Sequence, residues 1–196
     1  MYTPTLPLAT LVASLALTSA LPNPPIIRTR QTQPCFIIGT TPLPTEVSNI
    51  ATSLQNTVTC SATSKTLSSV PDVTSGTTSF SAVDFTASPL TPLAFALAEF
   101  ATATPLADTD LQRFQDTLNV YLATEVGIRS TGGNLAIKVP KFFLEMQVSR
   151  IQTAQGNAPK EPGLQVAHLR DKVVKNAAGE SRALLEQVVQ LAAQLE

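Results

Sequence analysis

Proline and glycine divide the second half of this chain into segments whose apolar residues recur at helical spacing. The clearest segment begins with Thr109 and Gln112, which form a capping box, and is expected to end at Gly127. Its apolar and aromatic residues recur every three or four positions: Leu111, Phe114, Leu118, Tyr121 and Leu122. Segments of this length and period are typical of short packed helices, so we predict a mainly α fold.

Five further segments follow the same rules. They cover residues 45–60, 92–104, 140–155, 164–178 and 181–194. The last one carries an apolar stripe that either docks on the other helices or binds a partner: Leu184, Leu185, Val188, Ala192 and Leu195. We predict a single-domain bundle of five or six helices with an irregular Ser/Thr-rich insertion over 61–89.

The first 20 residues have the features of a secretory signal peptide. Residues 6–20 carry no charge and end on the small residues Thr18 and Ala20. This run is short for the ~30 Å hydrocarbon core of a bilayer, and no later run reaches the ~18 apolar residues of a membrane helix. We therefore expect a secreted protein without a transmembrane segment. An uncleaved N-terminal anchor is the alternative, because residues 1–5 lack a positive charge.

Residues 21–34 are dense in proline and cannot form a helix. This segment is interpreted either as a flexible arm or as a short pro-segment cleaved after Arg30. Residues 35–196 then form the helical domain, which is long enough to bury its own core. We expect this domain to be a monomer.

The two cysteines of the chain, Cys35 and Cys60, both follow the expected signal peptide. In an oxidising compartment we expect them to form one disulfide, which would stabilise the fold by roughly 3 kcal/mol on the chain-entropy model. A catalytic or metal-binding thiol would need a nearby histidine, and the only histidine is His168, far along the chain.

Composition and motifs argue against several function classes. With a net charge of -1 and no basic cluster, the chain is not expected to bind nucleic acid, since Lys138 and Lys141 form a pair rather than a patch. His168 and Asp171 share a helical face, but no nucleophile motif accompanies them. Capping and surface roles are assigned to the carboxylates of the middle helices: Glu99, Asp108, Asp110, Asp116 and Glu125. We predict no catalytic residue, no metal site and no cofactor.

Six large apolar residues of the predicted helices have two possible roles. They are Phe95, Phe100, Phe114, Phe142, Phe143 and Met146. They either form the packed core or line a cavity for an apolar ligand between helices. If Phe142 and Phe143 are exposed behind Lys141, they would form a surface-binding edge instead.

Three stretches carry a resemblance to a known group of proteins. They are Val-Pro-Asp-Val-Thr-Ser-Gly at 70–76, Thr-Pro-Leu-Ala-Phe-Ala-Leu at 91–97, and the segment 127–143 that begins Gly-Ile-Arg-Ser-Thr-Gly-Gly. Together they resemble a largely uncharacterised family of small secreted proteins of filamentous fungi. The resemblance covers the chain from about Cys35 onwards and implies an extracellular or cell-wall setting. It implies no catalytic motif and no residue roles.

These observations lead us to expect a non-enzymatic interaction protein, acting at the fungal cell wall or, like an effector, on a host. Its partner would be an extracellular protein, a wall polysaccharide or an apolar ligand. The alternative is an extracellular carrier that holds lipid or another apolar molecule between its helices. A hydrolase with an unrecognised site is the least favoured function.

Overall fold

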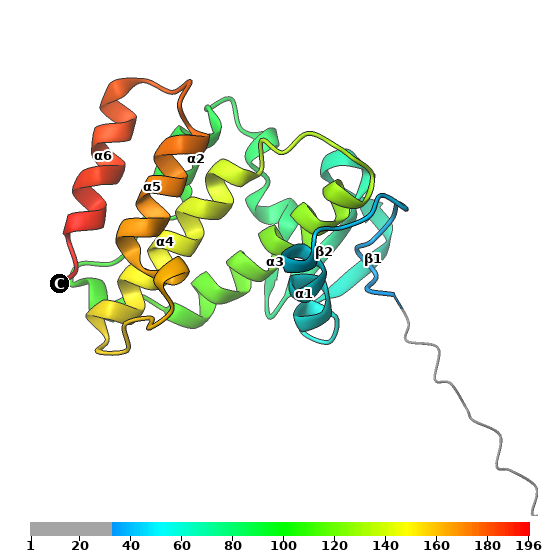
Figure 1. The fold of residues 1–196 in the computed structure, drawn as a ribbon, viewed down its shortest axis with the longest axis horizontal. Coiled ribbons are helices and arrows are strands. Elements are labelled where there is room, and N and C mark those ends of the chain that lie inside the picture. The colour runs from blue at the N-terminus through cyan, green and yellow to red at the C-terminus, as the bar shows by residue number, and fades with distance from the viewer. Residues whose placement is uncertain (1–32) are drawn as a thin grey trace, which may run out of the picture. The chain divides into compact units, whose positions relative to one another are not determined.

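Six α-helices and a three-stranded antiparallel sheet make up residues 33–196, which are the residues described by the computed structural model (Figure 1). The expected signal peptide over 1–20 and nearly all of the proline-rich arm over 21–34 lie outside the described residues. Within residues 33–196, the predicted mainly α single-domain fold is confirmed.

The long helix α3 connects the two parts of this fold. The bounds are α1 Thr45–Leu54, α2 Pro92–Glu99, α3 Leu111–Ser130, α4 Lys138–Ala154, α5 Val166–Asn176, α6 Arg182–Ala193, β1 Thr59–Lys65, β2 Pro71–Ser75 and β3 Thr78–Ser79. Helix α4 packs on α3, α2 and α5, and α6 packs on α5. Helix α1 and strands β2 and β3 pack on α3, at the opposite end of the molecule from α6 (Figure 1).

Hydroxyl and carboxylate caps fix where three of the helices begin. The Thr91 hydroxyl accepts a hydrogen bond from the Ala94 amide at the start of α2, and Ser181 caps α6 in the same way. Helix α3 differs from the prediction because Asp110, rather than Thr109, caps it by accepting from the Arg113 amide at 3.1 Å. The Thr109 side chain is buried, and its hydroxyl accepts from a backbone amide of the preceding loop.

The prediction that Gly127 ends the third helix is wrong. Helix α3 continues to Ser130, with Gly127 inside it. A Cβ atom at Gly127 would lie 2.6 Å from the carbonyl oxygen of Phe36 and 2.8 Å from the side chain of Val70. The glycine therefore allows the N-terminal segment and the start of β2 to approach the helix closely.

The prediction of a helix over 45–60 holds only for its first part. Helix α1 ends at Leu54, and Cys60 lies in β1, where it faces Val73 of β2. The Ser/Thr-rich insertion, predicted to be irregular, contains most of the three strands, with one turn of 3-10 helix between β1 and β2 and two more after β3. The region contributes buried apolar side chains to the core: Val70, Val73, Phe80, Val83 and Phe85. Strand pairing and burial thus hold in place a segment that lacks helical periodicity.

The predicted disulfide between Cys35 and Cys60 is confirmed. It links the segment before α1 to β1, with a Cα–Cα distance of 6.0 Å. No free cysteine occurs among the described residues. The bond therefore fixes the chain on both sides of α1 to the sheet.

An aromatic cluster joins the insertion to the helices. The Tyr121 ring of α3 lies 5.2 Å from that of Phe80 and 5.7 Å from that of Phe100, measured between centroids. Its hydroxyl donates a 2.6 Å hydrogen bond to the backbone oxygen of Val83. Burial raises the pKa of Tyr121 far above its ordinary value, and the nearby Asp84 carboxylate adds to this effect. Tyr121 is thus a neutral hydrogen-bond donor in the core.

Candidate functional site

The six residues expected to form the core or line a ligand cavity lie in separate places. Phe95, Phe100, Phe114, Phe143 and Met146 are buried in the core. Phe100 and Phe114 also border a hollow of about 310 Å³ beside β3, together with Arg113 and Glu99. Phe142 is half-buried and lines a different cleft. The alternative in which Phe142 and Phe143 are both exposed and form a surface-binding edge is therefore wrong, because Phe143 is fully buried.

The cleft beside Phe142 lies between α1, α3, α4, α5 and the 3-10 turn at Pro162–Leu164, and its volume is about 340 Å³. Its walls include apolar side chains from four elements: Val47, Ile50, Leu122, Val126, Phe142 and Leu164. Six charged residues also line it. Two are Glu46 and Lys172, and the other four pair with one another and form what we call its floor: Glu125, Arg129, Lys141 and Glu145. We call it the charged cleft.

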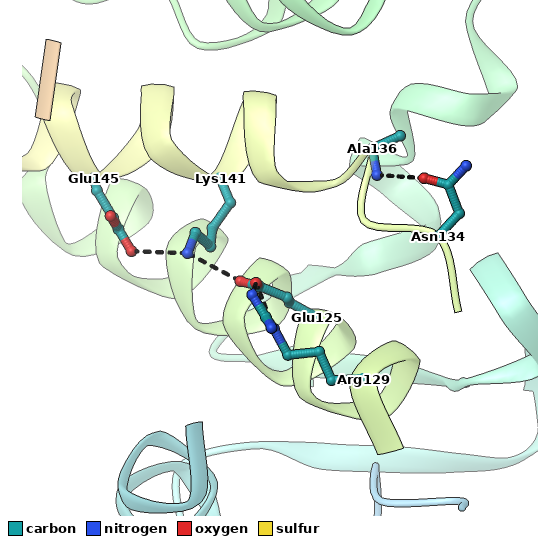
Figure 2. Close-up of polar contacts among 6 residues, drawn as sticks. All are labelled: Glu125, Arg129, Asn134, Ala136, Lys141 and Glu145. Carbon is teal, nitrogen blue, oxygen red and sulfur yellow. Dashed lines mark hydrogen bonds and ion pairs between the residues drawn. The ribbon is translucent and has the colours of Figure 1, made fainter. Parts of the chain in front are cut away.

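Figure 2 shows how the four charged side chains of the floor meet. One carboxylate oxygen of Glu125 accepts from Nε and Nη2 of Arg129, at 2.8 and 2.7 Å. Its other oxygen lies 2.9 Å from Nζ of Lys141. The same Nζ lies 3.6 Å from the Glu145 carboxylate. Glu125 and Lys141 are therefore the central pair of a four-residue ion network.

The sequence produces this arrangement through two helical pairs and one turn. Glu125 with Arg129, and Lys141 with Glu145, are each separated by four positions, so each pair shares one helix face. Between α3 and α4 the side-chain oxygen of Asn134 accepts from the Ala136 amide, which closes the turn before α4 (Figure 2). The turn brings the two faces together and allows Glu125 to reach Lys141.

The two carboxylates of the network have pKa values shifted in opposite directions. Burial alone would raise the pKa of Glu125, but Lys141 and Arg129 together lower it below its ordinary value. Burial raises the pKa of Glu145, and the more distant Lys141 only partly offsets that effect. Glu125 is thus held as a carboxylate, whereas Glu145 binds a proton more readily than an exposed glutamate.

Phe142 lines the charged cleft beside Lys172 of α5. Nζ of Lys141 lies 3.8 Å from the centroid of its ring, and Nζ of Lys172 on α5 lies 5.1 Å from the same point. Both distances are within the range of a cation–π contact. The ring therefore has two ammonium groups close to it.

Sequence reasoning missed this network. The predicted capping or surface role of Glu125 is wrong, because only 7% of its side chain is exposed. The sequence pairs Lys141 with Lys138 and gives no sign of Glu125 as its partner, although only 8% of the Lys141 side chain is exposed. The available signal was the presence of two opposite-charge pairs at helical spacing, one on each side of the 131–134 turn.

The structure places His168 and Asp171 three positions apart on one helix. Both are exposed on α5, and the carboxylate of Asp171 accepts from Arg170 rather than from His168. In residues 33–196, no group of three or more His, Cys, Asp or Glu side chains is placed to hold a metal ion. Over the same residues, every helix is too short or too polar to cross a membrane.

Comparison with known proteins gives one match. A family model described as a domain of unknown function, DUF7143, matches residues 37–196. No curated protein and no solved structure matches the chain significantly. The matched range includes all six helices, the three strands and the charged cleft.

Proposed function

This chain belongs to the DUF7143 family, whose function is unknown, and from that premise we propose that it is a secreted, non-enzymatic interaction protein. In this proposal it acts at the fungal cell wall or on a host, and the charged cleft receives a side chain of an extracellular protein partner. The Cys35–Cys60 disulfide supports an oxidising destination. The signal-like residues 1–20 and the resemblance to small secreted fungal proteins support secretion.

The observation that carries the proposal is the buried ion network at the floor of an apolar-walled cleft. Moving charges out of water costs free energy, and a buried network often contributes little net stability relative to apolar packing. Perturbed carboxylates in a cleft are therefore candidates for a functional role. Each of the four charges already has an opposite partner, which favours recognition over bond-breaking chemistry.

The composition of the cleft favours a protein partner over a purely apolar molecule. An apolar ligand would remove water from the network and supply no hydrogen bonds in return. A protein can place an apolar side chain against Ile50, Leu122 and Leu164 while its polar groups meet the charged floor. Leu164 is suited to the rim of such an interface, because 49% of its surface is exposed.

The test compares two variants that introduce the same charge at equally exposed positions. Leu164→Glu changes the rim of the charged cleft, and Val189→Glu changes α6, where the exposed fraction is 47%. Proteins captured from the extracellular fraction of the producing organism would be identified, purified and titrated against each variant. We expect at least one partner that binds wild type and Val189→Glu with equal Kd and binds Leu164→Glu at least about tenfold more weakly. If every captured partner binds both variants equally, the charged cleft is not the interface.

Transport of an apolar molecule is the second candidate function. The half-buried side chains of Ile50, Leu122 and Phe142 in one cleft favour it. Native mass spectrometry of the secreted protein tests it directly. A co-purifying apolar compound that is lost from Leu164→Glu and retained by Val189→Glu would support transport, whereas a bare protein mass would contradict it.

A further inference from the structure

A second hollow, of about 460 Å³, lies next to the charged cleft and shares Phe142 and Lys172 with it. We call it the basic hollow. Helix α4 supplies Lys138 and Phe142 to its lining, and α5 supplies His168, Lys172, Lys175 and Asn176. Its volume lies within the range of roughly 300–1,000 Å³ that is typical of small-ligand sites.

The basic hollow has an excess of positive charge. Lys138 and Lys175 have no ion pair or hydrogen bond among the described residues, and Lys172 faces the Phe142 ring. The carboxylate that lines it, Asp171, is held by Arg170 at 2.7 Å. The hollow is therefore lined by three ammonium groups and one carboxylate that already pairs with Arg170, while Glu145, which faces Lys172, lies outside its lining. Like charges on one helix face repel each other, and a bound anion would relieve the repulsion.

The remaining lining groups suit a sugar better than a bare anion. The half-buried Phe142 ring offers an apolar surface for the C–H face of a sugar ring. The amide nitrogen of Asn176 donates to the carbonyl oxygen of Lys172 at 2.8 Å, which leaves the side-chain oxygen of Asn176 free to accept from a hydroxyl. His168 adds a further exposed polar ring.

We propose that the basic hollow binds an acidic sugar unit of an extracellular polysaccharide, with its carboxylate or sulfate near Lys138, Lys172 and Lys175. A membrane surface fits less well, because the aromatic ring of the site is half-buried rather than protruding. This proposal does not rest on the protein-partner function. Lys138 and Lys175 line the basic hollow and are absent from the lining of the charged cleft.

The test measures binding of the full-length secreted protein to oligogalacturonate and to a sulfated oligosaccharide by calorimetry. The site variant is Lys138→Gln with Lys175→Gln. The matched control is Lys65→Gln with Lys160→Gln, which removes two exposed lysines that do not line the basic hollow. We expect wild type and the control to bind at least one of the two sugars equally. The site variant should bind that sugar at least about tenfold more weakly and lose affinity less steeply as salt increases.

Four results would overturn the proposal. The first is no binding of wild type to either acidic sugar at millimolar concentration. The second is an equal loss in the site variant and in the control, which would indicate general charge attraction. The third is that a fully methyl-esterified oligogalacturonate binds as tightly as the unesterified one, which would show that the carboxylate is not needed for binding. The fourth is tighter binding of an oligoglutamate peptide or of phosphatidylserine vesicles, which would assign the site to an acidic peptide or a membrane.

Discussion

Replacing Lys141 by methionine tests whether the ion network stabilises the pairing of α3 with α4. The substitution keeps the length of the side chain and removes the ammonium group that lies 2.9 Å from Glu125 and 3.6 Å from Glu145. Removing one partner of a buried ion pair typically costs about 3–5 kcal/mol, because the other charge stays buried and uncompensated. Arg129 still pairs with Glu125 in this variant, so we expect the lower end, about 3 kcal/mol, at pH 7.

Urea unfolding followed by circular dichroism, with the disulfide intact, measures this loss. With an m-value of about 1–3 kcal/mol/M, the expected loss moves the midpoint down by roughly 1–3 M urea. Lys160→Met is the matched control, because Lys160 is exposed and has no partner among the described residues. That control should change the free energy of unfolding by less than about 0.5 kcal/mol.

The loss caused by Lys141→Met should also shrink in acid. The pKa of Glu125 is lower in the folded protein than in the unfolded chain. Ionised Glu125 therefore stabilises the fold fully above its unfolded pKa, and this stabilisation disappears as the pH falls through its folded pKa. Without Lys141 the pKa values of Glu125 and Glu145 both rise, so protonation begins to relieve the variant while the pH is still above the ordinary glutamate pKa of about 4.3. Equal losses for Lys141→Met and Lys160→Met at pH 7, or a loss that stays constant down to pH 3, would refute this reasoning.

Three further predictions concern stability. Glu145→Gln should stabilise the protein at pH 7. The pKa of Glu145 is raised in the folded state, so the wild-type protein loses stability as the pH rises through that pKa, and a neutral glutamine avoids this loss. Urea unfolding should show the gain in stability disappearing near pH 4. Gly127→Ala should cost up to about 2 kcal/mol, since a helix gain of about 1 kcal/mol offsets part of an overpacking cost of about 1–3 kcal/mol; Gly179→Ala, with no neighbouring atom within 4 Å, should be close to neutral in the same assay. Reduction of Cys35–Cys60 should lower the free energy of unfolding by about 3 kcal/mol, and intact protein that reacts with a thiol reagent without reductant would contradict the disulfide.

The helices could be predicted because their signals are local. Thr91 with Pro92, and Ser181, fix the starts of α2 and α6 within a few neighbouring residues. The role of Gly127 could not be found in this way. Its reason is the approach of Phe36 and Val70, which lie far from it in the sequence. Glycine inside a helix and glycine at its end look the same until the tertiary contacts are known.

The two candidate sites were missed for a related reason. The central pair of the charged cleft joins Glu125 of α3 to Lys141 of α4, across a turn whose angle the sequence does not specify. The basic hollow joins Lys138 to Lys172 and Lys175, which belong to helices separated by a long loop. In the sequence, Lys138 has only Lys141 as a neighbouring lysine. The positive surface of the basic hollow arises because helix packing brings α4 and α5 together.

Binding at the charged cleft should be coupled to uptake of a proton by Glu145. Its side chain is still 18% exposed, and it is faced by Lys141 on its own helix, Glu125 on α3 and Lys172 on α5. A partner that covers the cleft removes the remaining water, and because burial already raises the pKa of Glu145, the bound state should have a still higher value.

Linkage then requires the affinity of the wild-type protein for its partner to increase as the medium is acidified from pH 7 towards 5. Each unit by which the pKa of Glu145 is higher in the bound state than in the free state allows an increase in affinity of up to about tenfold. Glu145→Gln removes this step, so it should bind tightly already at pH 7. The partner's own groups are the same in both measurements, so the difference between the two pH profiles reports Glu145 together with the groups coupled to it, Glu125 above all. Parallel profiles would mean that the partner does not exclude water from Glu145.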